Sequence, residues 1–102
     1  MPGSVPTPTG LLAATARVPA HVVYREFPAE VVLLNLNTGR YHGLNPTAGR
    51  MLRALEDQGS LALAVQTLAS DLAVSRERVE ADLVGFVLGL EERGLIEVER
   101  PA

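Results

Sequence analysis

The sequence predicts an α+β fold of the winged helix-turn-helix type, with a three-stranded antiparallel sheet followed by three helices. Residues 21–44 hold three β-branched or apolar runs separated by turn residues, which is typical of a strand meander. Residues 45–94 hold three segments with apolar residues at helical spacing, each preceded by a capping residue. A chain of 102 residues is long enough for one such domain with a modest core.

The N-terminal segment, residues 1–18, is expected to be a flexible tail. It holds Pro2, Pro6 and Pro8, with Pro19 at its edge, among Ser, Thr and Gly. Such a composition does not favour a packed core. We therefore expect a Pro-rich tail over residues 1–18 and a folded domain over residues 19–102.

Three strands are predicted in meander order. Residues 21–26 form the first, and Pro28 interrupts the extended pattern because proline cannot donate to a ladder. Residues 30–36 are a nearly continuous apolar run, which suggests a strand covered on both faces or nearly so. Gly39 supplies the positive φ that a hairpin turn needs before the short third strand, residues 40–44.

Three helices follow, and a capping residue introduces each one: Asn45, Ser60 and Ser75. Gly59 and Gly94 end the first and the third. The third helix is the longest and carries the widest apolar face, so we expect either the sheet or another molecule to cover the excess. Residues 95–98 are a last short extended piece.

The composition excludes several classes of protein. The net charge is −3, which suits a duplex-binding protein poorly because such proteins neutralise phosphates with Lys and Arg. Cysteine is absent, so disulfides, thiol nucleophiles and Cys-based zinc sites are excluded. No apolar run approaches the roughly 20 residues of a membrane span. The first residues lack the basic region of a secretory signal, and we expect a cytoplasmic protein without membrane contact.

No constellation of catalytic residues is evident. His21 and His42 are the only histidines, too few for a metal site, and no Gly-rich phosphate loop opens a helix. The acidic cluster of Glu77, Glu80 and Asp82 has an electrostatic explanation. It lies near the start of a helix, where negative side chains interact favourably with the positive end of the helix dipole. We therefore expect a protein that is not an enzyme and uses no cofactor and no metal.

The third strand offers a binding surface instead. It is an edge strand of the predicted meander, and residues 40–44 contain neither Pro nor Lys to block further pairing. Gly43 allows another backbone to approach closely. A peptide could pair with this edge and pack alternate side chains on the third helix, which is β-augmentation. The pattern alone leaves open that the protein's own tail or a dimer partner covers the edge.

Two motifs resemble the PqqD-like family. Residues 31–48 read VVLLNLNTGRYHGLNPTA, and residues 79–96 hold Val79, Asp82, Leu83, Phe86, Val87 and Leu90 before Gly-Leu-Ile. The resemblance covers about residues 20–98 and is strongest to the stand-alone PqqD-like proteins of lasso-peptide clusters. It implies a recognition element for ribosomally synthesised and post-translationally modified peptides (a RiPP recognition element), with a winged helix-turn-helix fold.

The resemblance also implies partners and site residues. The precursor leader, expected to carry a Tyr-x-x-Pro motif, adds beside the third strand and packs on the third helix. A separate cysteine peptidase removes the leader, and an ATP-dependent cyclase closes the ring. The positions that match the pairing strand are Arg40, Tyr41, His42, Gly43 and Leu44, and Leu34 of the middle strand could also reach the groove. Those on the third helix are Val79, Asp82, Leu83, Phe86 and Val87, among which Phe86 could equally belong to the core.

Two alternatives remain open from the sequence. One is a winged-helix nucleic-acid binder, in which the third helix would enter the major groove with Arg76 and Arg78 at its start, although Glu80 and Asp82 follow at once. The other is a PqqD-type chaperone of pyrroloquinoline quinone biosynthesis.

Overall fold

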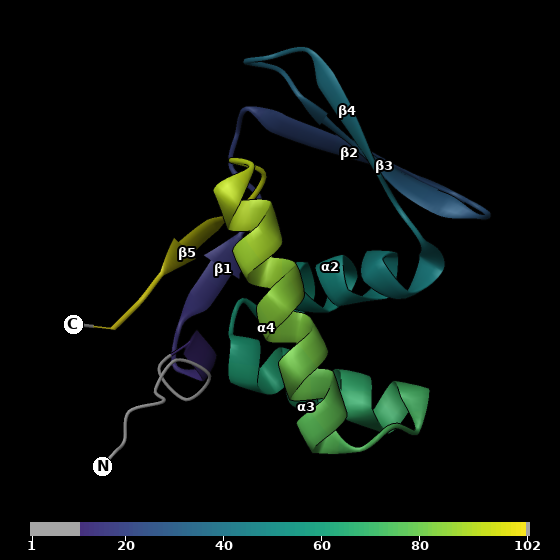
Figure 1. Cartoon of the computed structure of the whole chain (residues 1–102), viewed down its shortest axis with the longest axis vertical. Coiled ribbons are helices and arrows are strands. Elements are labelled where there is room, and N and C mark those ends of the chain that lie inside the picture. Colours follow the sequence, from purple (N-terminus) through teal and green to yellow (C-terminus); the bar gives the residue numbers. More distant parts are fainter. Residues whose placement is uncertain (1–10, 102) are drawn as a thin grey trace.

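The computed structural model describes residues 11–101 and contains the predicted meander. Strands β2 (Val22–Phe27), β3 (Glu30–Asn35) and β4 (Arg40–Leu44) form one antiparallel sheet in the order β2-β3-β4 (Figure 1). Gly39 has a φ of +74° in the turn that joins β3 to β4. This confirms the expected turn, because only glycine adopts that backbone conformation without strain.

The three helices begin where the capping residues predict. They are α2 (Pro46–Gln58), α3 (Leu61–Leu72) and α4 (Arg76–Glu92). Asn45 Oδ1 accepts a hydrogen bond from the backbone N–H of Ala48 at 2.8 Å. In the same way, the hydroxyls of Ser60 and Ser75 accept from the backbone N–H groups three residues later, each at 3.2 Å. In Figure 1, α2 crosses beneath the sheet, and α4 runs from the α3 end of the molecule toward it.

A second, two-stranded sheet joins the two ends of the described chain and was not predicted. Strand β1 (Thr15–Arg17) pairs antiparallel with β5 (Glu97–Glu99). Leu11, Ala14 and Ala16 are buried in the core. The expectation of a flexible tail is therefore wrong for residues 11–18, because burial and pairing with a strand some 80 residues away fix them. The remainder of that predicted tail, residues 1–10, lies outside the described residues.

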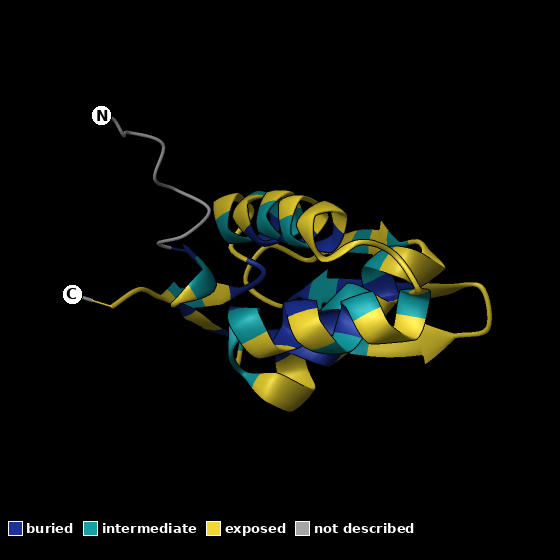
Figure 2. Ribbon diagram, turned by 90° about the horizontal axis from the view of Figure 1, so that it is seen from below, coloured by how far each residue is buried: buried dark blue, intermediate teal, exposed yellow. Residues whose placement is uncertain are grey.

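The main sheet buries only one of its faces. Val31 and Leu33 of β3 point toward the helices and are buried, whereas Val32 and Leu34 are half-buried on the opposite face. Figure 2 shows the buried residues gathered between the helices and the strands. The expectation that β3 is covered on both faces is therefore wrong, since no helix of residues 11–101 covers the outer face.

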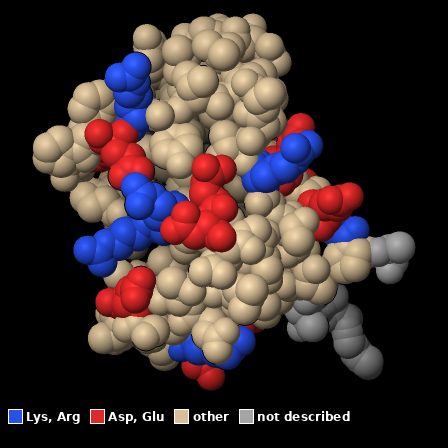
Figure 3. Space-filling model, turned by 180° about the vertical axis from the view of Figure 1, so that it is seen from behind, with Lys and Arg blue, Asp and Glu red and all other residues tan. Residues whose placement is uncertain are grey.

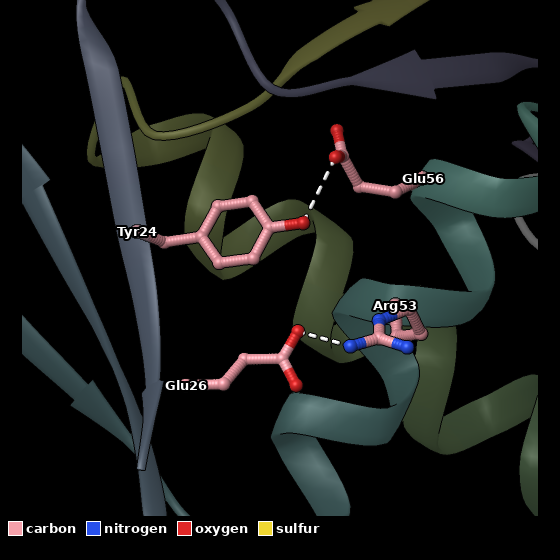
Figure 4. Close-up of polar contacts among 4 residues, drawn as sticks. All are labelled: Tyr24, Glu26, Arg53 and Glu56. Atoms are coloured by element: carbon pink, nitrogen blue, oxygen red, sulfur yellow. Dashed lines mark hydrogen bonds and ion pairs between the residues drawn. The ribbon is translucent and has the colours of Figure 1, made fainter.

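Polar contacts fix the sheet against α2. The Tyr24 hydroxyl on β2 donates to Glu56 Oε1 at 3.0 Å, and Arg53 pairs with Glu26 (Figure 4). Burial raises the pKa of Tyr24, and its hydrogen bond to the Glu56 carboxylate raises it further. These contacts lie along β2, so β4 is left at the opposite edge of the sheet.

Candidate functional site: the groove between β4 and α4

Strand β4 is an edge of the main sheet. The pairing of β3 with β2 shows which backbone groups of β3 point toward β4, and hence which backbone groups of β4 have no partner in the sheet. Directly opposed residues of an antiparallel ladder alternate between bonded and non-bonded pairs. The Leu36 N–H donates to the His21 carbonyl at 2.7 Å, one step beyond the last pair of β2 with β3. Because bonded and non-bonded pairs alternate, the N–H and C=O groups of Leu34 point toward β2. Those of Leu33 and Val31 point toward β4.

The free groups of β4 follow from this phase. Leu33 is opposite His42 and Val31 is opposite Leu44, so the backbone groups of His42 and Leu44 bond to β3. Tyr41 and Gly43 therefore turn their N–H and C=O groups to the open edge. Four backbone groups are thus available to another strand, among the strands of residues 11–101.

A groove lies beside this edge. Its cavity has a volume of about 260 Å³ and lies between the end of β4, the start of α2 and the second half of α4. Gly43 and Leu44 line it from the strand side, and Gly85, Phe86 and Gly89 line it from α4. A Cβ atom on Gly85 or Gly89 would meet no described atom within 4 Å. The surface of α4 therefore carries no side chain at these two glycines, and a peptide backbone or side chain can approach the helix there.

The structure brings together only part of the predicted site. Gly43, Leu44 and Phe86 line the groove, and Tyr41 supplies free backbone groups beside it. Arg40 begins β4 and is exposed, and His42 is half-buried on the helix-facing side of the strand, opposite buried Leu33.

Four other predicted residues lie elsewhere. Leu83 and Val87 are fully buried in the core, and Val79 is 4% exposed. These three apolar side chains, which were expected to form the floor of the groove, therefore pack in the core instead. Leu34 lies opposite Tyr41 and Val23 on the outer face and cannot reach the groove, which corrects the expectation for it. Pleating decides this, since successive side chains of a strand point to opposite faces.

The residues that sequence reasoning missed are the small ones. Gly85, Gly89 and Ala48 line the groove, with Arg93 at its end. The available signal was their spacing: Gly85 and Gly89 lie four positions apart on one face of α4, and Arg93, which caps the helix, follows four positions later. Glycine in a helix interior weakens the helix, so two glycines on one face indicate a place where another backbone or side chain can approach closely.

Asp82 is exposed at the start of the same face. Its carboxylate lies 3.7 Å from Arg78 Nε, one helical turn away. This pair offsets the charge of Arg78, one of the two arginines at the N-terminal end of α4. Figure 3 shows acidic and basic side chains interspersed on the face that it presents, without a large area of one sign. The net charge of −3 does not favour the nucleic-acid alternative.

The groove supplies backbone hydrogen bonds and apolar contact rather than reactive groups. Within residues 11–101, no group of three or more His, Asp or Glu side chains could hold a metal ion. In the same part of the chain, no helix combines the length and the apolar character needed to cross a bilayer. An open strand edge beside such a groove can accept a further strand.

Comparisons with known proteins find similar folds among solved structures. Two solved structures are similar, each with a TM-score of 0.74. "TbiB1 in Complex with the TbiA(beta) Leader Peptide" is 33% identical, with 79% of this chain and 94% of that chain covered. "Lasso peptide synthetase B1 complexed with the leader peptide" is 30% identical, with 81% and 98% covered.

No curated protein matches the chain in sequence. The family model described as coenzyme PQQ synthesis protein D (PqqD) matches residues 30–96, which hold β3, β4 and all three helices α2, α3 and α4. With this match and an open strand edge beside α4, the chain belongs to the PqqD family.

Proposed function

We propose that this protein binds the leader segment of a ribosomally synthesised precursor peptide, of the lasso-peptide class, as an additional strand beside β4. The observation that carries the proposal is the pair of residues Tyr41 and Gly43, whose free backbone groups border a groove lined by Gly85 and Gly89. Both similar solved structures are complexes with a leader peptide, which supports leader binding by this chain.

Elementary energetics permits such binding. Four strand hydrogen bonds contribute about 0.5–1.5 kcal/mol each, and each buried apolar anchor adds about 1.5–3 kcal/mol. Ordering a disordered leader costs about 2–5 kcal/mol. With two or three such anchors and the favourable end of each range, the remainder after the cost of association reaches a dissociation constant of about a micromolar, which allows the leader to be released after cleavage.

We further propose that the protein performs no chemistry itself and presents the leader to a cysteine peptidase, with an ATP-dependent cyclase acting afterwards. The outer face of the sheet supports a peptidase contact. Val23, Leu34 and Tyr41 form one row across it, and Val23 and Tyr41 are 45% and 71% exposed. An added leader strand would extend the same sheet, so a protein docked on this face would contact the leader too.

The binding proposal is tested by removing one outward N–H. Tyr41→Pro deletes a donor at the open edge and leaves the bonds between β3 and β4 in place, since edge positions that face solvent tolerate proline. Tyr41→Ala is the matched control, because it removes the side chain and keeps the N–H. Titration calorimetry would use synthetic lasso-precursor leaders carrying Tyr-x-x-Pro.

We expect Tyr41→Pro to weaken leader binding at least tenfold and Tyr41→Ala to change it much less. Equal affinity of the Pro variant and the wild type would contradict strand addition at β4, provided that circular dichroism shows the same fold. Cleavage of a leader by the isolated wild-type protein would contradict the non-catalytic role.

A further inference from the structure

A second cavity lies farther along α4 and has no part in strand pairing. Its volume is about 350 Å³, and it opens between the start of α2, the end of α3 and the first turns of α4. Apolar side chains form most of its lining: Met51, Leu68, Leu72, Val74 and Val79. Thr47, Arg78 and Asp82 stand beside them. Val74 is 39% exposed although it borders this apolar space, so the cavity is open to an incoming side chain.

The two cavities share one face of α4. Arg78 and Asp82 line the second cavity, and Gly85 and Gly89 line the groove beside β4. These residues follow one another at intervals of three or four, so they form a single stripe along the helix. On α2, the neighbours Thr47 and Ala48 line one cavity each. The second cavity therefore lies next to the groove along the same face of α4.

We propose that the bound peptide extends beyond its paired strand along this stripe and seats one large apolar side chain in the second cavity. The inference rests on the proposed function, because the occupant is the flank of the same leader. The position of the second cavity, directly beside the groove at the open edge, argues for this occupant over an unrelated partner. The cavity volume falls at the lower end of the range for small ligand sites, roughly 300–1,000 Å³, which suits a single large side chain.

The geometry also sets the spacing of this anchor. Asp82 and Gly89 are seven positions apart on α4, which corresponds to about 10 Å along the helix axis. An extended peptide covers that distance in about three residues. The apolar anchor therefore lies about three residues from the leader residue that occupies the groove at Gly89.

The experiment compares two variants with two peptides. Val74→Asp places a carboxylate at the rim of the second cavity, and its position is already partly exposed, so the fold tolerates it. Leu63→Asp is the matched control, because Leu63 is 47% exposed on α3 and lines neither cavity. Each protein is titrated with a full-length leader and with leaders shortened residue by residue from either end to the paired segment.

We expect Val74→Asp to weaken binding of the full-length leader at least tenfold and to leave the shortest leader unaffected. Shortening from one end should lower wild-type affinity in a single step when the anchor is removed, and amide signals of residues 72–74 should shift only with leaders that keep it. Leu63→Asp should match the wild type throughout.

Three results would overturn the inference: full-length binding unchanged in Val74→Asp, equal weakening by Leu63→Asp, or equal affinity of the wild type for long and short leaders. These outcomes differ from failure of the proposed function. If no leader binds the wild type, or if Tyr41→Pro binds as tightly as the wild type, strand addition itself fails.

Discussion

Val31 on β3 and Gly49 on α2 touch so closely that a Cβ atom at position 49 would lie 2.8 Å from Val31 Cγ2. Real Cβ atoms do not approach side chains this closely, so the main sheet lies on α2 at a distance that only glycine permits. Because Val31 is also opposite Leu44 in the ladder, the same contact helps to place the end of β4 beside the groove.

This contact predicts a strong effect of a single methyl group. Gly49→Ala should lower the free energy of unfolding by about 1–3 kcal/mol, the usual cost of overpacking a core. Gly85→Ala is the control, since a Cβ there meets no described atom within 4 Å, and alanine should raise helix stability by about 0.5–1 kcal/mol. Urea unfolding measures both, and a stabilised Gly49→Ala would contradict the close approach.

Filling the groove should remove binding without harming the fold. Gly89→Leu places a side chain in the open space of the groove, so leader affinity should fall at least tenfold while the free energy of unfolding is kept or raised. Ala81→Leu makes a comparable change at an exposed position of α4 that lines none of the described cavities. Its leader affinity should equal that of the wild type in the same titration, and a similar loss in both variants would argue against the groove.

The outer face of the sheet should matter for cleavage rather than for leader affinity. Val23→Lys introduces a charge into the apolar row that Val23 forms with Leu34 and Tyr41, so docking of the peptidase should weaken. Leader removal by the partner peptidase should slow at least tenfold, with leader affinity unchanged. Leu63→Lys is the control, at 47% exposure against 45% for Val23. Normal cleavage with Val23→Lys would place the peptidase contact elsewhere.

Alkaline pH should loosen the contact between β2 and α2. The pKa of Tyr24 is raised above the usual 10.0, first by burial and then by its bond to Glu56, so the folded state favours the neutral phenol. This stabilisation is complete below pH 10 and disappears as the pH rises from there through the raised pKa. Unfolding measured between pH 8 and 11 should therefore show a steeper loss of stability in the wild type than in Tyr24→Phe.

Glu56→Gln provides the matching control for that titration. It keeps an acceptor for the Tyr24 hydroxyl and removes the negative charge that disfavours phenolate, so its loss of stability should lie between those of the wild type and Tyr24→Phe. Identical pH profiles for all three proteins would show that Tyr24 does not contribute to the pH dependence.

The sequence alone determined the elements whose signals are local. Asn45, Ser60 and Ser75 cap the helices as predicted, and Gly39 makes the hairpin turn. Caps and turns are readable because one or two residues set the backbone conformation there. The motif around residues 40–44 likewise indicates the family and the strand at the open edge.

Tertiary structure alone decided which faces these elements bury. The apolar stripe containing Leu83 and Val87 packs in the core, and the small residues Gly85 and Gly89 are left to line the groove. Residues 15–17 pair with a strand at the other end of the chain, a contact that no local pattern records. Periodicity gives an element its faces, but only packing between distant segments determines which face is covered and which stays open to a peptide.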